Sequence, residues 1–187
     1  MKSITFGGGC FWCMDAIFKR IKGVESVVSG YAGGEVKDPS YHDVTTGKTG
    51  HAEVLKVGYD PAVISLSELL DIFFALHDPT TLNRQGADMG TQYRSVIFCE
   101  NSLDADICQK KISDLTSSHE FTDPIVTEVK VDTEFYDAEK YHQDYYDQNR
   151  GQPYCEYVIS PKIKKLLQMF GSKVKEGNSE KGMEEIL

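Results

Sequence analysis

Short strand-like segments alternate with amphipathic helical segments along this chain, and this alternation most constrains its fold. The apolar residues of the strand-like segments are interrupted by polar ones, unlike the continuous apolar strands of a buried parallel sheet. We therefore predict an α+β fold, a two-layer sandwich in which helices cover a mixed or antiparallel sheet. The predicted strands span residues 2–6, 24–31, 52–59, 93–99 and 125–131.

The clearest predicted helix follows the capping box Ser65-Leu66-Ser67-Glu68 and continues with apolar residues at helical spacing as far as Leu76. Pro161 predicts the start of a last helix that runs to Phe170, with Ser160 as its N-cap. Two long polar stretches without clear periodicity, residues 35–50 and 77–92, predict loops with room for a functional site. The other predicted helices begin at Phe11 and span residues 103–115 and 138–148.

The length of 187 residues predicts one domain, which we place at residues 1–170 as a single catalytic domain. Residues 171–187 are rich in Lys, Glu, Ser and Gly, so we expect a flexible C-terminal tail. No apolar run approaches the roughly 20 residues that a membrane span needs. The first residues do not form a secretory signal, so we expect a cytoplasmic protein.

A formal net charge of -9 argues against a general nucleic-acid surface, because phosphate binding needs clustered Lys and Arg. The chain has five cysteines, an odd number, and lacks a recognisable export signal. Both features favour reduced thiols over a disulfide framework. The cysteines are therefore candidates for chemistry.

The segment Gly8-Gly9-Cys10-Phe11-Trp12-Cys13 places a thiol where a strand turns into a helix. The positive helix end and its free backbone N–H groups favour a thiolate, so we expect a lowered pKa for Cys10. The structural alternative is an inert core cysteine.

Glu53 shares a strand face with Leu55, Val57 and Tyr59, because side chains alternate along a strand. Burial there predicts a raised pKa, so that the carboxyl group stays protonated and can donate. A salt bridge or a position at the sheet's rim is the alternative. Tyr41 and Tyr93 offer hydroxyl donors, although in a chain with ten tyrosines either one can serve packing alone.

Four separated segments resemble the signature motifs of the A-type peptide methionine sulfoxide reductases, which act on the S epimer. The resemblance runs from about Ile4 to about Ile163 and implies an α+β sandwich with a ferredoxin-like core. The four segments are Gly9-Cys10-Phe11-Trp12, Gly50-His51-Ala52-Glu53-Val54, His77-Asp78-Pro79-Thr80-Thr81-Leu82-Asn83-Arg84-Gln85 and Gly86-Ala87-Asp88-Met89-Gly90-Thr91-Gln92-Tyr93-Arg94-Ser95.

The resemblance implies that Cys10 attacks the sulfoxide sulfur while Glu53 supplies a proton to its oxygen. It also implies that the hydroxyl groups of Tyr41 and Tyr93 hold this oxygen, and that Asp88 lines the same site. Phe11 and Trp12 are expected to form the wall of a pocket for the methionine methyl group. A sulfoxide of the wrong hand would place its oxygen against this apolar wall, so the site is expected to select one epimer.

After reduction, Cys10 is expected to remain as a sulfenic acid that condenses with a second thiol. Cys155 resembles the resolving cysteine of many members and is the first choice. Cys13 is the second, since it lies three residues from Cys10 where many members have Gly. A thioredoxin-like protein is the expected reductant, and no cofactor or metal is expected. Cys99 and Cys108 are expected to be core or bystander thiols.

Two other functions were weighed. The spacing Cys10-Phe11-Trp12-Cys13 is also that of a general thiol-disulfide oxidoreductase. That function does not explain Glu53 on an apolar strand face. A non-catalytic zinc module using Cys10 and Cys13 would need a second close pair, and Cys99 with Cys108 is a poor one. We therefore predict a methionine sulfoxide reductase.

Overall fold

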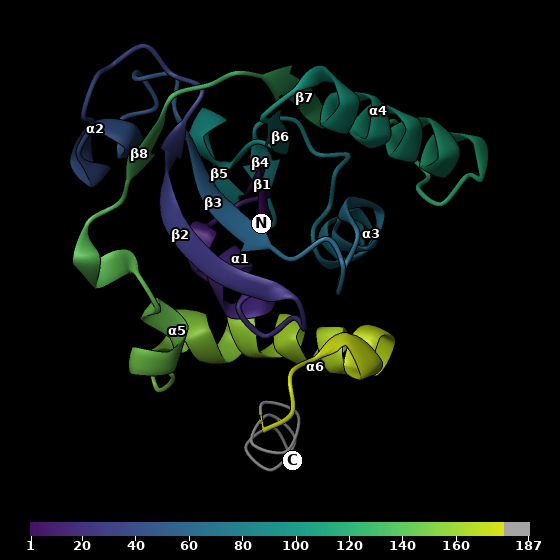
Figure 1. Cartoon of the computed structure of the whole chain (residues 1–187). Helices are drawn as coiled ribbons and strands as arrows, with labels where there is room; N and C mark the ends of the chain where they lie inside the picture. The colour runs from purple at the N-terminus through teal and green to yellow at the C-terminus, as the bar shows by residue number, and fades with distance from the viewer. Residues whose placement is uncertain (178–187) are drawn as a thin grey trace.

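The computed structural model describes residues 1–177 and contains a curled six-stranded sheet with the order β7-β6-β1-β3-β2-β8 (Figure 1). All neighbouring strands are antiparallel except β6 and β7, which are parallel. The predicted mixed α+β architecture is therefore confirmed. The strands are β1 (Lys2–Gly7), β2 (Val24–Ala32), β3 (Ala52–Tyr59), β6 (Val96–Cys99), β7 (Glu128–Val131) and β8 (Phe135–Asp137).

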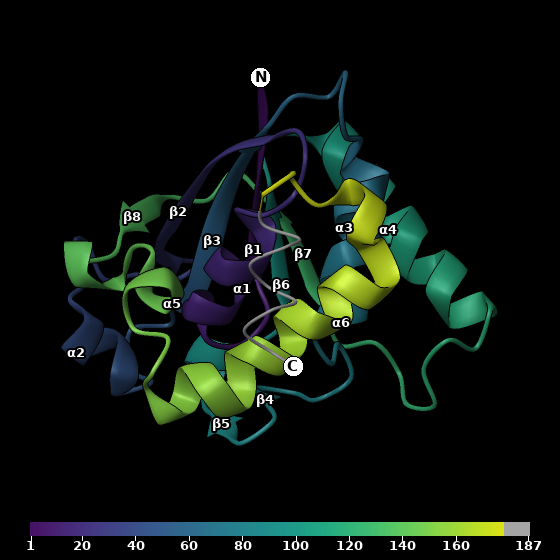
Figure 2. The same cartoon turned by 90° about the horizontal axis from the view of Figure 1, so that it is seen from below.

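The helices α1 (Phe11–Phe18), α3 (Leu66–Leu76) and α6 (Ser160–Phe170) enclose the main core against the sheet, and α6 crosses below α1 in Figure 2. Phe6 of β1 stacks on both Phe18 and Phe73, with ring centroids 5.1 and 4.7 Å apart. These contacts pack the end of β1 against the end of α1 and against α3. The longer helix α4 (Ser102–Ser117) packs on α3 and on the β6–β7 side of the sheet.

The predicted capping box begins α3 as expected. The Ser65 hydroxyl accepts a hydrogen bond from the Glu68 amide at 3.2 Å, and Glu68 accepts one from the Ser65 amide at 2.8 Å. These bonds satisfy two amide donors at the helix start. Leu69, Leu70 and Phe73 follow at helical spacing and are fully buried.

Both predicted loops contain short elements that the sequence analysis missed. Residues 35–50 include α2 (Tyr41–Thr45), which begins with a capping box between Ser40 and Asp43. Residues 77–92 include a small hairpin of β4 (Arg84–Gln85) and β5 (Asp88–Met89). The predicted strand 93–99 begins only at Val96, because residues 91–93 form a 3₁₀ turn.

The predicted helix 138–148 is wrong over most of its length. A 3₁₀ turn covers residues 140–142, and α5 (Tyr145–Gln148) is a single short turn. The Gln143 side chain instead bonds both the amide and the carbonyl of Ser29, each at 2.9 Å. Asp144 takes a left-handed conformation with φ 56°, which a helix interior does not allow. Long-range pairing with β2 therefore overrides the helical pattern.

The last helix also differs from the prediction. A π-helix over Cys155–Ile159 leads directly into α6, so Ser160 is not an N-cap. The Ser160 hydroxyl donates a hydrogen bond to the Cys155 carbonyl at 3.1 Å. The next residue, Pro161, has no amide proton to donate. Within the part of the chain described, no helix combines the length and apolar character needed to cross a membrane.

The start of the predicted tail is attached to the domain. Residues 171–173 form a 3₁₀ turn, and Val174 is buried and pairs with Ile21 as an isolated bridge. The Lys175 amide donates to the Arg20 carbonyl at 2.9 Å. Residues 171–175 therefore contact the domain, at the point where the sequence predicts that a flexible tail begins. Residues 178–187 of that predicted tail lie outside the described residues.

Candidate active site

Cys10 occupies the N-cap position of α1, directly after the three glycines that end β1. Gly9 adopts φ 96°, a conformation that favours glycine. A Cβ atom at Gly9 would also lie 2.6 Å from Cγ of Gln85. The turn that positions Cys10 therefore depends on a glycine packed against the β4–β5 hairpin.

A cavity of about 180 Å³ opens beside Cys10. It brings together the thiol, a carboxyl group and the aromatic side chains that the sequence analysis selected, although they come from distant segments. Every predicted catalytic and substrate-binding residue lines it, with one addition, Tyr154. The lining residues are Cys10, Phe11, Trp12, Tyr41, Glu53, Asp88, Tyr93 and Tyr154.

Glu53 points from β3 to the start of α1, where it is 1% exposed. Its carboxyl group accepts a hydrogen bond from the Phe11 amide at 3.1 Å. Burial raises the pKa of Glu53 from 4.5 to about 8, while the bond from Phe11 opposes the shift. The carboxyl group is therefore mostly protonated at neutral pH, in agreement with the predicted direction.

The expected lowering of the Cys10 pKa is wrong. Burial raises the pKa of the Cys10 thiol well above its usual 9.0, and the nearby Glu53 carboxylate raises it further. Hydrogen bonds from the Trp12 amide and the Tyr154 hydroxyl lower the pKa but do not outweigh burial. The first amide of α1 is also engaged by Glu53 rather than by the thiol. Cys10 therefore rests as a neutral thiol.

Two tyrosine hydroxyl groups face the cavity from α2 and from the 3₁₀ turn before β6. Burial raises the pKa of Tyr41 to about 12 and also raises the pKa of Tyr93. Both groups are therefore neutral hydrogen-bond donors at physiological pH. Glu139 holds the start of α2 by accepting from the Tyr41 amide at 3.3 Å.

Trp12 forms a wall of the cavity and is held from behind by two residues of the 141–146 segment. Its ring stacks on Tyr145 with centroids 3.7 Å apart, and its indole N–H donates to Nδ1 of His142 at 3.1 Å. The ring of Phe11 lies 5.0 Å from that of His142. The aromatic residues of the 141–146 segment thus support the cavity wall.

Tyr154 is the cavity residue that the sequence analysis missed. Its hydroxyl donates to Asp88 at 2.7 Å and lies 3.8 Å from the sulfur of Cys13. The tyrosine therefore connects the hairpin carboxylate to the cysteine segment. Its position directly before Cys155 was the available signal.

The sequence profile of the family described as peptide methionine sulfoxide reductase matches residues 2–174. The chain belongs to this family. Proteins called peptide methionine sulfoxide reductase MsrA from Trichodesmium erythraeum and Saccharolobus solfataricus are 52% and 51% identical to it, over 93% and 94% of this chain and 98% of each relative. The reduced form of Mxr1 from Saccharomyces cerevisiae aligns with a TM-score of 0.75 and 40% identity, covering 82% of this chain and 88% of that one.

Family membership makes the chain a reductase of methionine sulfoxide, and it favours this activity over the two alternatives weighed from the sequence. All five cysteines are free thiols. Among residues 1–177, no three His, Cys, Asp or Glu side chains are grouped to hold a metal ion. The zinc-module alternative therefore also lacks a ligand set in the described part of the reductase.

The two candidate resolving cysteines of the reductase lie beside the site in one apolar cluster. The Cys13 amide donates to the Cys10 carbonyl at 3.1 Å, so Cys13 lies one turn along α1. Cys155 is fully buried at the start of the π-helix and does not line the Cys10 cavity. Cys13 and Cys155 belong to the same cluster, against which Cys10 also packs.

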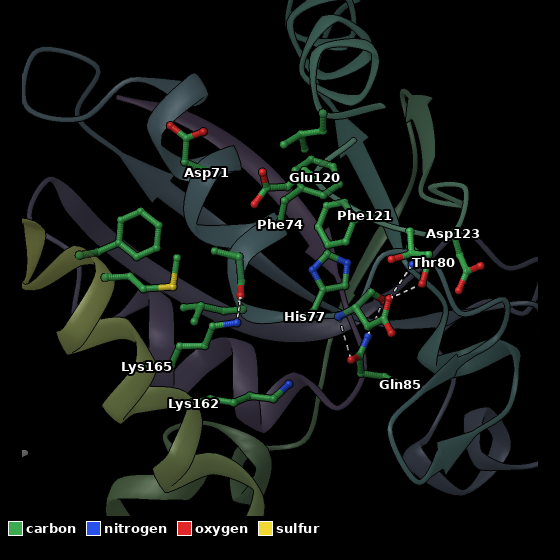
Figure 3. A pocket seen from close by; sticks show the side chains of 17 residues that line it. Asp71, Phe74, His77, Thr80, Gln85, Glu120, Phe121, Asp123, Lys162 and Lys165 are labelled. Carbon is green, nitrogen blue, oxygen red and sulfur yellow. Dashed lines mark hydrogen bonds between the residues drawn. The ribbon is translucent and has the colours of Figure 1, made fainter. Parts of the chain in front are cut away.

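The reductase has a larger cavity of about 940 Å³ between the end of α3, the 120–123 loop and α6 (Figure 3). Lys165 donates to the Ala75 carbonyl at 2.7 Å there, and Gln85 bonds the backbone of Asp78. No cysteine is among the described residues that line this space. The smaller cavity, with its thiol and protonated carboxyl group, is therefore the candidate active site.

Proposed function

We propose that the reductase converts methionine S-sulfoxide to methionine with Cys10 as nucleophile and Glu53 as acid. One observation carries the proposal: the Cys10 thiol and a buried carboxyl group with a raised pKa line the same small cavity. A sulfoxide sulfur becomes open to attack when its oxygen receives a proton or a strong hydrogen bond. Glu53 supplies this proton, and the hydroxyls of Tyr41 and Tyr93 hold the oxygen.

The proposed step balances without a cofactor. The Cys10 sulfur bonds to the sulfoxide sulfur, the sulfoxide oxygen takes the Glu53 proton, and the thiol proton passes to the Glu53 carboxylate. The hydroxyl group then transfers to the Cys10 sulfur, so that the substrate S–O bond and the new S–S bond both break, and methionine leaves Cys10 as a sulfenic acid. The sulfoxide is reduced by two electrons and the Cys10 sulfur is oxidised by two.

We infer that the epimer preference arises from the Trp12 and Phe11 wall. The methyl group of the S epimer fits this apolar wall when the oxygen points to Glu53. The other epimer exchanges the two groups and leaves the oxygen without a donor, an arrangement that costs at least about 1 kcal/mol. The stacking of Trp12 on Tyr145 supports a rigid wall.

We propose that Cys13 condenses first with the Cys10 sulfenic acid, which forms a disulfide and releases water. Cys10 precedes the first helical residue and has ψ 129°. Its backbone is therefore not helical, so helical geometry does not restrict how its side chain reaches the Cys13 sulfur. Cys155 then exchanges with Cys13, because both belong to one cluster. In the competing order, which the family resemblance implies, Cys155 condenses directly with the Cys10 sulfenic acid.

A thioredoxin-like protein is the proposed reductant of the final disulfide. Mxr1 from Saccharomyces cerevisiae has been solved in complex with Trx2, and this structure aligns with the chain at a TM-score of 0.53 and 31% identity, over 74% of this chain and 81% of that one. We extend this partner class to the reductase. The proposed cytoplasmic location fits a cycle that needs reduced thiols, and cell fractionation tests it.

We also propose that β1-α1-β2-β3-α3-β6 is the ferredoxin-like core of a two-layer sandwich, with the sheet as one layer and the helices as the other. The antiparallel order β6-β1-β3-β2 supports this assignment, and so do the two helices, each of which joins a central strand to an outer strand. We regard residues 1–170 as one catalytic domain. An expressed 1–170 fragment that fails to reduce sulfoxide would show that the attached residues after it also belong to the domain.

A single-turnover assay with both sulfoxide epimers tests the function. The reduced enzyme is expected to release methionine from the S epimer at least about fivefold faster than from the R epimer, the rate ratio that about 1 kcal/mol gives. Cys13→Ser and Cys155→Ser are matched variants for the second step. If Cys13 is the first partner, Cys155→Ser still forms a disulfide after one turnover, whereas Cys13→Ser accumulates sulfenic acid. The opposite pattern would make Cys155 the first partner.

A further inference from the structure

A second pair of cysteines lies away from the active site. Cys99 is the last residue of β6, and Cys108 lies in the second turn of α4. Their sulfur atoms are 3.8 Å apart, and the residues are 3% and 0% exposed. β6 starts beside Gly7, at the catalytic end of β1, and runs away from Cys10. The pair is therefore remote from the catalytic cycle.

The contact is asymmetric in a way that suits oxidation to a disulfide. Either thiol can be the donor of the hydrogen bond between the two sulfurs, and this bond lowers the pKa of Cys99 while raising that of Cys108. The nearby charge of Asp104 opposes this effect, because it raises the pKa of Cys99. Bond formation needs the sulfurs to approach by only about 1.8 Å from their present contact. Each sulfur thus has a partner in place.

The position of the pair also gives a disulfide a mechanical role. Cys108 and Asp104 are the fully buried residues of α4, while Ala105, Ile112 and Leu115 are only partly buried against the core. Asn101 caps α4 by accepting from the Asp104 amide at 2.9 Å. A bond between Cys99 and Cys108 would join the end of β6 to α4 across this short capped turn.

We propose that Cys99 and Cys108 are an oxidisable dithiol that hydrogen peroxide converts to a disulfide, which fastens α4 to β6. The Cys99 thiolate attacks one peroxide oxygen, the O–O bond breaks, and the departing hydroxide takes a proton to become water. The Cys108 sulfur then attacks the Cys99 sulfenic acid, the S–O bond breaks, and the Cys108 proton leaves with the hydroxide as a second water. Two electrons pass from the two sulfurs to the peroxide.

The experiment uses the full chain with Cys10, Cys13 and Cys155 changed to Ser, so that only this pair can react. After treatment with hydrogen peroxide under conditions where circular dichroism shows a folded protein, the intact mass is expected to fall by two hydrogens and to recover with dithiothreitol. Peptide mapping of the oxidised wild-type chain is expected to show the same Cys99–Cys108 link. The matched control adds Cys108→Ser and should trap Cys99 as a sulfenic acid that dimedone labels.

Oxidation that occurs only after denaturation, or cross-links of Cys99 only to other cysteines, would overturn the proposal. The mechanical part has its own readout. Amide hydrogen exchange in α4 is expected to slow by roughly threefold or more in the disulfide form, because the helix then opens less often. Unchanged exchange in α4 would show that the bond does not fasten the helix.

Discussion

Two pairs of cysteines in this reductase lie where a strand leads into a helix, yet their surroundings differ. Cys10 begins α1 next to a cavity of about 180 Å³ that Glu53 also lines. Cys99 and Cys108 contact each other inside the main core. A thiol at such a junction is therefore not sufficient for catalysis. An accessible space and a proton donor distinguish the catalytic candidate from the buried pair.

The electrostatics of the two pairs sharpen this lesson. The pKa of Cys10 is raised by burial and by Glu53, whereas the pKa of Cys99 is lowered by the bond from Cys108. The thiol that faces the cavity is thus the less acidic of the two. This difference agrees with the proposal that Glu53 protonates the sulfoxide oxygen, since that step does not need a thiolate formed in advance.

The largest expected effect is the loss of turnover in Cys10→Ser, because the nucleophile is removed. The matched control is the double variant Cys99→Ala with Cys108→Ala, which should retain kcat within about twofold if that pair has no part in the cycle. Methionine release with dithiothreitol as reductant measures both. Activity in Cys10→Ser, or its loss in the control, would remove the distinction between the pairs.

The next largest effect is expected for Glu53→Gln. The amide can still accept the bond from the Phe11 amide but cannot give a proton to the oxygen, so the reduction step should slow by roughly 10²-fold. Single-turnover methionine release at neutral pH measures this step without recycling. An unchanged rate would show that Glu53 is not the acid.

A stability measurement supplies the folding control for Glu53→Gln. The pKa of Glu53 is raised in the folded chain, so the native state holds its proton between about pH 4.5 and 8 while the unfolded state loses it. Wild-type stability from this group therefore falls as the pH rises through that range. The Gln variant does not titrate, and its Tm relative to wild type should increase from pH 4.5 to pH 8.

Smaller effects are expected for Tyr41→Phe and Tyr93→Phe. Each removes one neutral donor to the oxygen, worth about 1 kcal/mol, so each should slow single-turnover reduction roughly fivefold. Tyr59 is a useful matched control, since it is a buried tyrosine near Cys99 and Cys108. Tyr59→Phe should leave the rate unchanged. An equal loss in all three variants would point to general destabilisation.

The smallest effect is expected for Tyr154→Phe. This change removes the 2.7 Å bond to Asp88, the contact with Cys13 and the hydrogen bond to the Cys10 thiol, but it leaves both Cys10 and Glu53 in place. We expect a two- to threefold decrease in the reduction rate, of the size that a peripheral hydrogen bond gives. Disulfide formation after one turnover, followed by thiol titration, should also slow. A decrease as large as that of Glu53→Gln would place Tyr154 among the reacting groups.

Local rules predicted much of this molecule. The Ser65 capping box, the strand that carries Glu53, and the glycine break before Cys10 each depend on neighbouring residues. The likeness to a known family then supplied roles for Tyr41, Tyr93 and Asp88, whose local sequence is uninformative. The structure brings Tyr41, Tyr93 and Asp88 to the same cavity as Cys10 and Glu53.

The missed features depend on contacts between distant segments. The helix expected at 138–148 is broken because Gln143 pairs with the backbone of β2. Tyr154 reaches the site through Asp88, 66 residues earlier in the chain. The Cys10 pKa was predicted in the wrong direction because a helix start is visible in sequence, whereas the burial that outweighs it comes from tertiary packing.

The pH dependence of single-turnover methionine release tests the central claim most directly. If a protonated Glu53 with a pKa of about 8 gives its proton to the sulfoxide oxygen, the wild-type rate should be steady near pH 7 and fall about tenfold per unit well above pH 8. Glu53→Gln should be slow and lack this decline. A wild-type rate that keeps rising through pH 9, with the same profile in Glu53→Gln, would contradict the account.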